Sequence, residues 1–165
     1  MHLEFLTGFG ILLCYFAVCA SSALLLRRYV RVPREVFRKI LHMIVIGSIF
    51  VWTYAFKTWW VSVIAAIVFT AVVFPFLAFA ERFPGYSELL TERKQGEIKR
   101  SLVVVFGMFS GLISVCWGLL GEKYLVVASV LAWGLGDAAA ALIGKRFGRQ
   151  FITGRLVEGR KSLEG

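Results

Sequence analysis

Charged residues are scarce in this sequence, and their scarcity excludes an ordinary soluble domain. Only 18% of the 165 residues are charged, whereas 59% are hydrophobic, and soluble domains average about 25% charged residues. The scarcity also leaves long uncharged runs, and about 18 or more consecutive apolar residues are enough to cross a bilayer. The sequence therefore predicts an integral membrane protein.

Uncharged runs recur along the chain and predict an all-α fold, a polytopic transmembrane helix bundle with about five spans. The second run is short and contains His42, and the fifth contains a single ionisable residue, Asp137. The connections are too short to build cores of their own, so we expect one integral membrane domain, residues 1–165. The expected spans are residues 5–26, 40–56, 58–80, 101–120 and 124–144.

Cysteines are few, and no two of them have a C-x-x-C spacing. This excludes a zinc site or a disulfide framework as a reasonable interpretation, and Cys14, Cys19 and Cys116 are expected to be small buried apolar residues. The first uncharged run also lacks the preceding basic segment of a signal peptide. We therefore expect an uncleaved first span with the N-terminus outside.

The net charge of +9 is compatible with nucleic-acid binding, but the distribution of basic residues favours another explanation. If the five runs cross the membrane alternately, segments 27–39, 81–100 and 145–165 lie on one side and carry six, five and six Lys and Arg residues. The two connections on the other side carry one each. Basic residues concentrate on the cytoplasmic side of membrane proteins, so these three segments are predicted to be cytoplasmic, with no nucleic-acid partner.

Asp137 is the least expected residue in the spans. A carboxylate within a span costs about 2.5–3.5 kcal/mol on insertion scales and usually faces a cavity or a partner. Because Gly134 and Gly136 weaken the helix before it, we expect the span to break there and restart with Asp137 as N-cap, aiming a positive helix end into a polar cavity. Two interpretations remain: a structural cap or ion-pair partner, and a functional carboxylate that binds a divalent metal beside phosphates.

His42 is the other ionisable residue in a span, and it follows two cations at helical spacing. Arg38, Lys39 and His42 share one face of a helix near its predicted cytoplasmic end. A lone histidine is often a hydrogen-bonded structural residue. The neighbouring cations make a phosphate-binding or catalytic role an equal alternative.

Two G-x-x-x-G spacings occur in the chain and are interpreted differently. For Gly107 and Gly111, with no polar residue nearby, close helix packing is expected. For Gly144 and Gly148, the intervening Lys145 and Arg146 make an approach of phosphate to the backbone as plausible as helix packing.

The C-terminal tail nearly matches a phosphate-binding loop but is not one. An extra arginine breaks the G-x-x-x-x-G-K-[ST] register, and no apolar strand precedes it. The remaining cluster of Arg160, Lys161 and Ser162 suits phosphate contacts, with an ordinary charged tail as the alternative. The other charges of segment 81–100 are expected to be mostly solvated, and Trp52, Trp59 and Trp60 to be interface anchors.

Four stretches together resemble the CTP-dependent membrane lipid kinases, which include dolichol, phytol and farnesol kinases and a CTP-using diacylglycerol kinase. They are RKILH (38–42), Gly96 with Glu97, GDAAAALIGKRFG (136–148) and EGRKSLEG (158–165). The chain is also similar, more loosely, to the phosphatidate cytidylyltransferases. Those enzymes show Ser-Pro-Lys where this chain has Glu158, Gly159 and Arg160, which favours the kinase branch.

The resemblance implies CTP as donor, Mg²⁺ or another divalent cation, and a membrane lipid alcohol as acceptor at the cytoplasmic face. It implies metal and phosphate binding by Asp137, and triphosphate contacts by Lys145, Arg146, Arg160 and Lys161. The tail is expected to cover a site at the ends of the second and fifth spans. The family usually continues beyond the motif that ends at Gly165, so a C-terminally truncated, inactive chain is also expected.

Two other functions remain as alternatives. One is a cytidylyltransferase that makes CDP-diacylglycerol, and the other is a non-enzymatic membrane protein. A homo-oligomer formed through small-residue helix faces is a further expectation.

Overall fold

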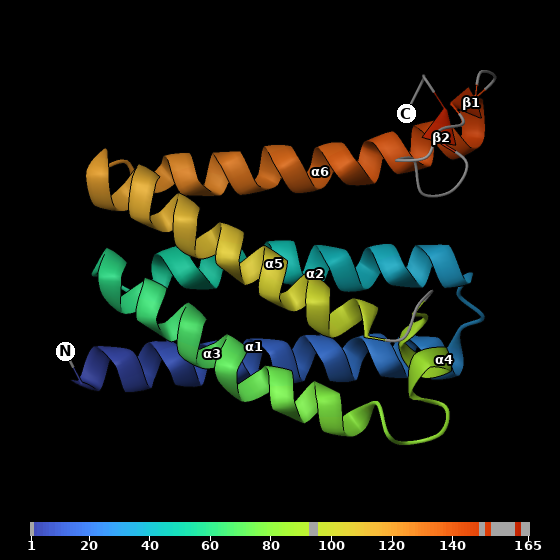
Figure 1. Ribbon diagram of the computed structural model, residues 1–165, viewed down its shortest axis with the longest axis horizontal. Helices are drawn as coiled ribbons and strands as arrows, with labels where there is room; N and C mark the ends of the chain where they lie inside the picture. The colour runs from blue at the N-terminus through green and yellow to red at the C-terminus, as the bar shows by residue number, and fades with distance from the viewer. Residues whose placement is uncertain (1, 93–95, 149–150, 153–160, 163–165) are drawn as a thin grey trace. The chain divides into compact units, whose positions relative to one another are not determined.

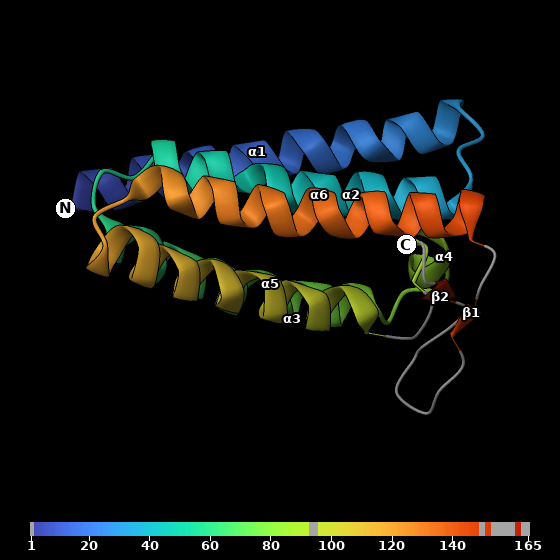
Figure 2. The same cartoon turned by 90° about the horizontal axis from the view of Figure 1, so that it is seen from above.

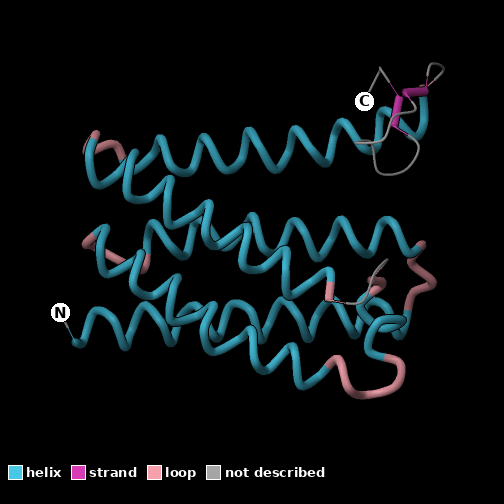
Figure 3. Tube along the Cα trace, in the orientation of Figure 1, coloured by secondary structure: helices cyan, strands magenta, loops and turns pink. Residues whose placement is uncertain are grey.

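The computed structural model describes residues 2–92, 96–148, 151–152 and 161–162, and these residues are almost entirely helical (Figures 1 and 3). Within these residues, five helical segments are long and apolar enough to cross a membrane, which confirms the all-α prediction and agrees with the expected number of spans. The elements are α1 (His2–Tyr29), α2 (Arg34–Tyr54), α3 (Trp59–Ala80), α4 (Tyr86–Leu90), α5 (Glu97–Leu112), a π-helix η1 (Ile113–Leu119), α6 (Lys123–Phe147), and strands β1 (Phe151–Ile152) and β2 (Lys161–Ser162).

The chain divides into two compact units, an N-terminal unit of residues 1–130 and a C-terminal unit of residues 131–165. In the N-terminal unit, α1 packs on α2 and α3, and α3 packs on α5 and η1. Figure 2 shows α1 and α2 in one layer and α3 and α5 in a second. In the C-terminal unit, β1 and β2 form an antiparallel pair in which Ile152 lies opposite Lys161.

The α1–α2 and α3–α5 connections lie together at one end of the N-terminal unit, here called the basic end (Figure 1). The α1–α2 connection is shorter than expected, because α1 continues to Tyr29 and α2 begins directly after Pro33. Proline is well tolerated at a helix start. As a result, Arg38 and Lys39 lie on a helix and not in a loop.

The core of the N-terminal unit is aromatic. The Phe69 ring of α3 lies 4.9 Å from Phe16 of α1 and 5.2 Å from Phe106 of α5, measured between ring centroids. Trp52 of α2 lies 5.7 Å from Phe106 in an edge-to-face arrangement, the geometry that aromatic quadrupoles favour. These rings link the two layers.

At the opposite end, a carboxylate of α1 fixes the start of α3. Glu4 accepts hydrogen bonds from the backbone amides of Lys57 and Thr58, at 2.8 and 2.9 Å. The first amides of a helix have no partner within the helix, and negative charge is favoured there. One turn further along α1, Gly8 lies against the buried Phe56 ring.

The fourth span changes from α-helix to π-helix at Ile113, which the sequence did not signal. The amide of Leu120 donates to the carbonyl of Val115 at 3.0 Å, a five-residue step. Gly118 in this segment lies against the Trp59 ring, where a Cβ atom would be 3.0 Å from the ring. The wide turn thus coincides with a close approach of an aromatic ring to the backbone.

Two predictions about individual residues in the spans, those for Trp52 and Cys14, are wrong, and a third, for Gly107 and Gly111, has no support within the described chain. Trp52 is fully buried and donates to Ser48 Oγ at 3.2 Å, so it is a core residue and not an interface anchor. Gly107 and Gly111 are exposed, and a Cβ atom added to either would meet nothing within 4 Å, so this pair makes no close helix contact within the described chain. Of the cysteines, Cys116 is buried as expected but Cys14 is exposed.

Candidate functional site

Asp137 lies in the interior of α6, which runs without a break from Lys123 to Phe147. The predicted break at Gly134–Gly136 is therefore wrong, and no helix N-terminus is present beside Asp137. Two glycines cost about 1 kcal/mol each relative to alanine. Breaking a helix within hydrocarbon would leave backbone groups without partners, at several kcal/mol per group. The continuous helix therefore has the lower free energy. Asp137 is exposed as a residue.

The continuous helix determines which site residues share a face with Asp137. Gly144 and Gly148 follow by seven and eleven residues, which places them within about 20° of Asp137 around the axis at 3.6 residues per turn. The Gly148 amide donates to the Gly144 carbonyl at 3.1 Å, so the helical register continues to Gly148. Arg146 lies on the opposite face and its guanidinium is 5.7 Å from the Phe147 ring centre. The helix thus groups the carboxylate with the glycines and separates Arg146 from them.

The second group of predicted site residues lies in the first turns of α2. Arg38 forms an ion pair with Glu35 at 2.9 Å, with 27% of the Arg38 side chain exposed. Lys39 and His42 are half-buried, and the Nε2 atom of His42 is buried. The helix thus brings Arg38, Lys39 and His42 to one end of α2 as predicted, with Glu35 as an additional acidic neighbour.

The tail residues fall partly within the described chain. Lys161 and Ser162 form β2 and pair with β1, so the tail backbone returns to the segment that follows α6. Arg160 lies outside the described residues, and of Lys145 only the position on α6 is described. Because His42 belongs to the N-terminal unit and Asp137 to the C-terminal unit, the predicted meeting of the two stays a prediction.

A buried polar cluster at the basic end was not predicted. Lys99 Nζ lies 2.5 Å from Glu81 Oε2, and only 6% of the Glu81 side chain is exposed. Glu81 Oε1 and the Tyr86 hydroxyl are buried without a hydrogen-bond partner among the described residues. Glu81 is therefore an exception to the expectation that most charges of segment 81–100 are solvated. The sequence feature that could have indicated this ion pair is the position of Glu81 and Lys99 at the ends of two apolar runs.

Glycine shapes the loop around this cluster. Gly96 immediately precedes α5 and has φ +78°, in the left-handed region that favours glycine. A Cβ atom at this position would lie 3.0 Å from Lys99 Cε. The Ile98 amide in the first turn of α5 donates to Glu92 Oε1 at 3.1 Å. Burial, together with the negative charges of Glu92 and Glu81, raises the pKa of Tyr86 to about 12.

The donor set around Asp137 fits magnesium only when a nucleotide accompanies the ion. Among the described residues, no group of three His, Cys, Asp or Glu side chains is placed to hold a metal. Magnesium, however, is commonly held by one or two carboxylates together with substrate phosphates and water. One exposed carboxylate beside two glycines meets that requirement.

The comparisons with known proteins identify no relative. No protein-family model, curated protein or solved structure matches this chain.

Proposed function

We propose that this protein is a CTP-dependent kinase that phosphorylates a membrane lipid alcohol of the polyprenol, phytol or diacylglycerol type. The observation that carries the proposal is an exposed carboxylate, Asp137, in the interior of an apolar helix with Gly144 and Gly148 on the same face. A carboxylate is costly in that setting, and the glycines leave room for a phosphate chain beside it.

The orientation proposed for the site is cytoplasmic. The segments that carry six, five and six basic residues belong on the side where membrane proteins concentrate Lys and Arg. CTP is then available to the site from the cytoplasm, and the lipid alcohol enters from the bilayer.

The reaction proposed is attack of the lipid hydroxyl oxygen on the γ-phosphorus of CTP, with CDP leaving. Magnesium, when bound with the nucleotide, supplies charge neutralisation on the triphosphate. Asp137 holds that complex through its carboxylate. Lys145, Lys161 and Ser162 bind phosphate oxygens, and Arg38 and Lys39 add positive charge. His42 accepts the hydroxyl proton on its imidazole.

The test is transfer of label from CTP to extracted lipid in membranes that contain the protein and magnesium. One reaction contains CTP labelled at the γ-phosphate and the other CTP labelled at the α-phosphate. We expect label from γ only, and a loss of about a hundredfold or more in Asp137→Asn. Label from α only would instead identify a cytidylyltransferase and would make His42 a phosphate ligand.

A binding measurement distinguishes a protein that binds magnesium–CTP without transferring phosphate from a protein that does not use CTP at all. Magnesium–CTP should raise the melting temperature of the purified protein but not that of Asp137→Asn. Glu122→Gln is the matched control, because Glu122 is an exposed acid just before α6. Absence of both label transfer and magnesium–CTP binding, or equal effects of the two variants, contradicts the proposal.

A further inference from the structure

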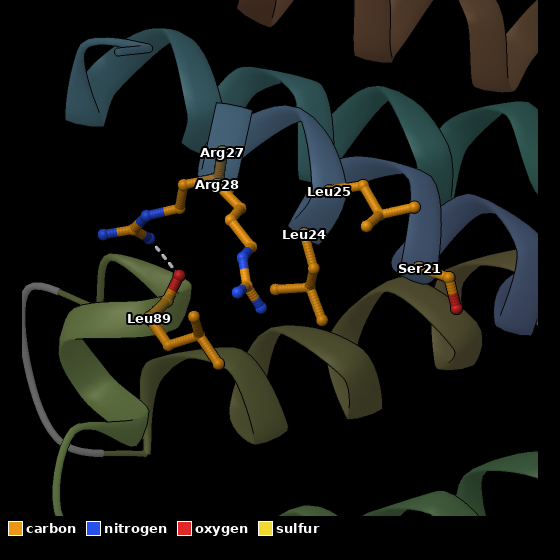
Figure 4. Close-up of a pocket in the computed structure, with 6 residues that line it drawn as sticks. All are labelled: Ser21, Leu24, Leu25, Arg27, Arg28 and Leu89. Atoms are coloured by element: carbon orange, nitrogen blue, oxygen red, sulfur yellow. Dashed lines mark hydrogen bonds between the residues drawn. The ribbon is translucent and has the colours of Figure 1, made fainter. Parts of the chain in front are cut away.

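A pocket at the basic end of the N-terminal unit lies outside the proposed catalytic residues. It has a volume of about 620 Å³ and lies between the last turns of α1 and the short helix α4 (Figure 4). This volume is in the range of small-molecule sites, about 300–1,000 Å³. The lining residues are Ser21, Leu24, Leu25, Arg27, Arg28 and Leu89.

The α1 wall of the pocket is one helical stripe with an apolar part and a cationic end. Ser21, Leu24, Leu25 and Arg28 follow the i, i+3, i+4, i+7 spacing that places residues on one face. The uncharged run of α1 ends just before the two arginines, so the stripe crosses from hydrocarbon depth to the membrane surface. Leu89 of α4 supplies an apolar wall on the other side (Figure 4).

The two arginines at the end of this stripe have different roles. Arg27 donates hydrogen bonds to the carbonyl oxygens of Glu88 and Leu89, and its guanidinium lies 4.9 Å from the centre of the Phe37 ring. These carbonyls belong to the last turn of α4, where helical partners are lacking. Arg27 therefore attaches α4 to α1 and holds the pocket open between them.

Of the two arginines that line the pocket, Arg28 is the one that remains available to a ligand. Its side chain is exposed, extends between Leu24 and Leu89, and forms no ion pair with a carboxylate in the described chain (Figure 4). A guanidinium matches the geometry of a phosphate through two parallel hydrogen bonds. Basic residues at a membrane surface also attract anionic lipids.

We propose that this pocket binds an anionic membrane phospholipid. The phosphate of the lipid pairs with Arg28, and the beginning of an acyl chain lies along Leu24 and Leu25. The positive charge of Arg28, with Arg27 beside it in the pocket lining, complements a net negative head group better than a zwitterionic one. The ligand therefore differs from the uncharged lipid alcohol of the proposed reaction, and the site does not depend on that reaction.

The test is titration of the purified full chain with phosphatidylglycerol, with bound lipid counted by native mass spectrometry. Arg28→Gln is expected to raise the dissociation constant about tenfold, the loss of one charge-assisted pair. Arg31→Gln is the matched control, because Arg31 is exposed in the α1–α2 connection and does not line the pocket. It should change the constant less than twofold, and Arg28→Lys should restore only part of the binding, because an ammonium keeps the charge but cannot make the two parallel hydrogen bonds.

A second variant separates a lipid site from a phosphate site. Leu89→Gln changes the apolar wall and should weaken phosphatidylglycerol binding while leaving binding of inorganic phosphate unchanged. Equal effects of Arg28→Gln and Arg31→Gln would overturn the proposal in favour of diffuse surface charge. Displacement of phosphatidylglycerol by equimolar inorganic phosphate, or equally tight binding of phosphatidylcholine, would also overturn it.

Discussion

Gly8 and Gly10 in α1 form a matched pair at the level of single residues. A Cβ atom at Gly8 would lie 2.5 Å from Cε1 of the buried Phe56 ring, whereas one at Gly10 would meet nothing within 4 Å. Gly8→Ala should therefore lower the free energy of unfolding by about 1–3 kcal/mol, the usual cost of overpacking. Gly10→Ala should raise it by up to about 1 kcal/mol through helix propensity. Thermal unfolding in detergent measures both, and a stabilised Gly8→Ala would contradict the packing.

Tyr86 gives the protein a dependence on alkaline pH. Its folded-state pKa of about 12 exceeds the ordinary value of 10.0, so the folded state favours the protonated phenol. The stability from this preference is complete below about pH 10 and is lost as pH rises to about 12. We expect the melting temperature to fall over this interval less steeply in Tyr86→Phe than in the wild type. Tyr124→Phe, at an exposed position, is the control for the loss of a phenol that is not buried.

The residues that sequence reasoning placed wrongly are those whose environment depends on tertiary packing. Trp52 lies near the end of its span, where tryptophan is often an interface anchor, but the direction of its ring depends on how α2 faces α3 and α5. Glu81 lies at the C-terminal end of α3 and is buried in an ion pair with Lys99 of α5. Hydropathy places a residue along the membrane normal but not around the helix.

The continuity of α6 is a testable statement about an element. Gly136 lies within the helix, and a Cβ atom there would meet nothing within 4 Å. Gly136→Ala should therefore raise the free energy of unfolding by up to about 1 kcal/mol. Gly121 is the matched control, because it also has open space but has φ +73°. Gly121→Ala should destabilise by about 1 kcal/mol or more, and destabilisation by Gly136→Ala would restore the predicted break.

The elements themselves could be predicted from the sequence because uncharged runs and helices coincide. Four of the five expected spans agree with the observed helices to within a few residues at each end, and α2 begins six residues before its expected start. Local propensity around Pro33 and Glu35 extends this helix beyond the apolar run. The π-helical turns of η1 and the antiparallel β1–β2 pair had no periodic signal in the sequence. Neither had the pocket, which requires α4 to contact α1.

At the scale of the whole molecule, the distribution of basic residues and the length of α3 together predict on which side of the membrane each end of α3 lies. Lys57 and Arg82 are exposed and lie just beyond the two ends of α3, a helix of 22 residues. Such a helix is about 33 Å long, enough to cross the hydrocarbon core. Positions 57 and 82 should therefore lie on opposite sides of the membrane, with 82 on the cytoplasmic side because its segment carries five basic residues against one.

Single-cysteine labelling of intact cells tests this arrangement. Lys57→Cys and Arg82→Cys are introduced separately after Cys14, Cys19 and Cys116 are replaced by serine or alanine. A membrane-impermeant maleimide should label position 57 in intact cells and position 82 only after permeabilisation. Labelling of both in intact cells would mean that α3 does not span the bilayer. The reverse pattern would place the arginines of α1 and α2 outside, away from cytoplasmic CTP, and would remove the proposed kinase reaction together with the orientation on which it depends.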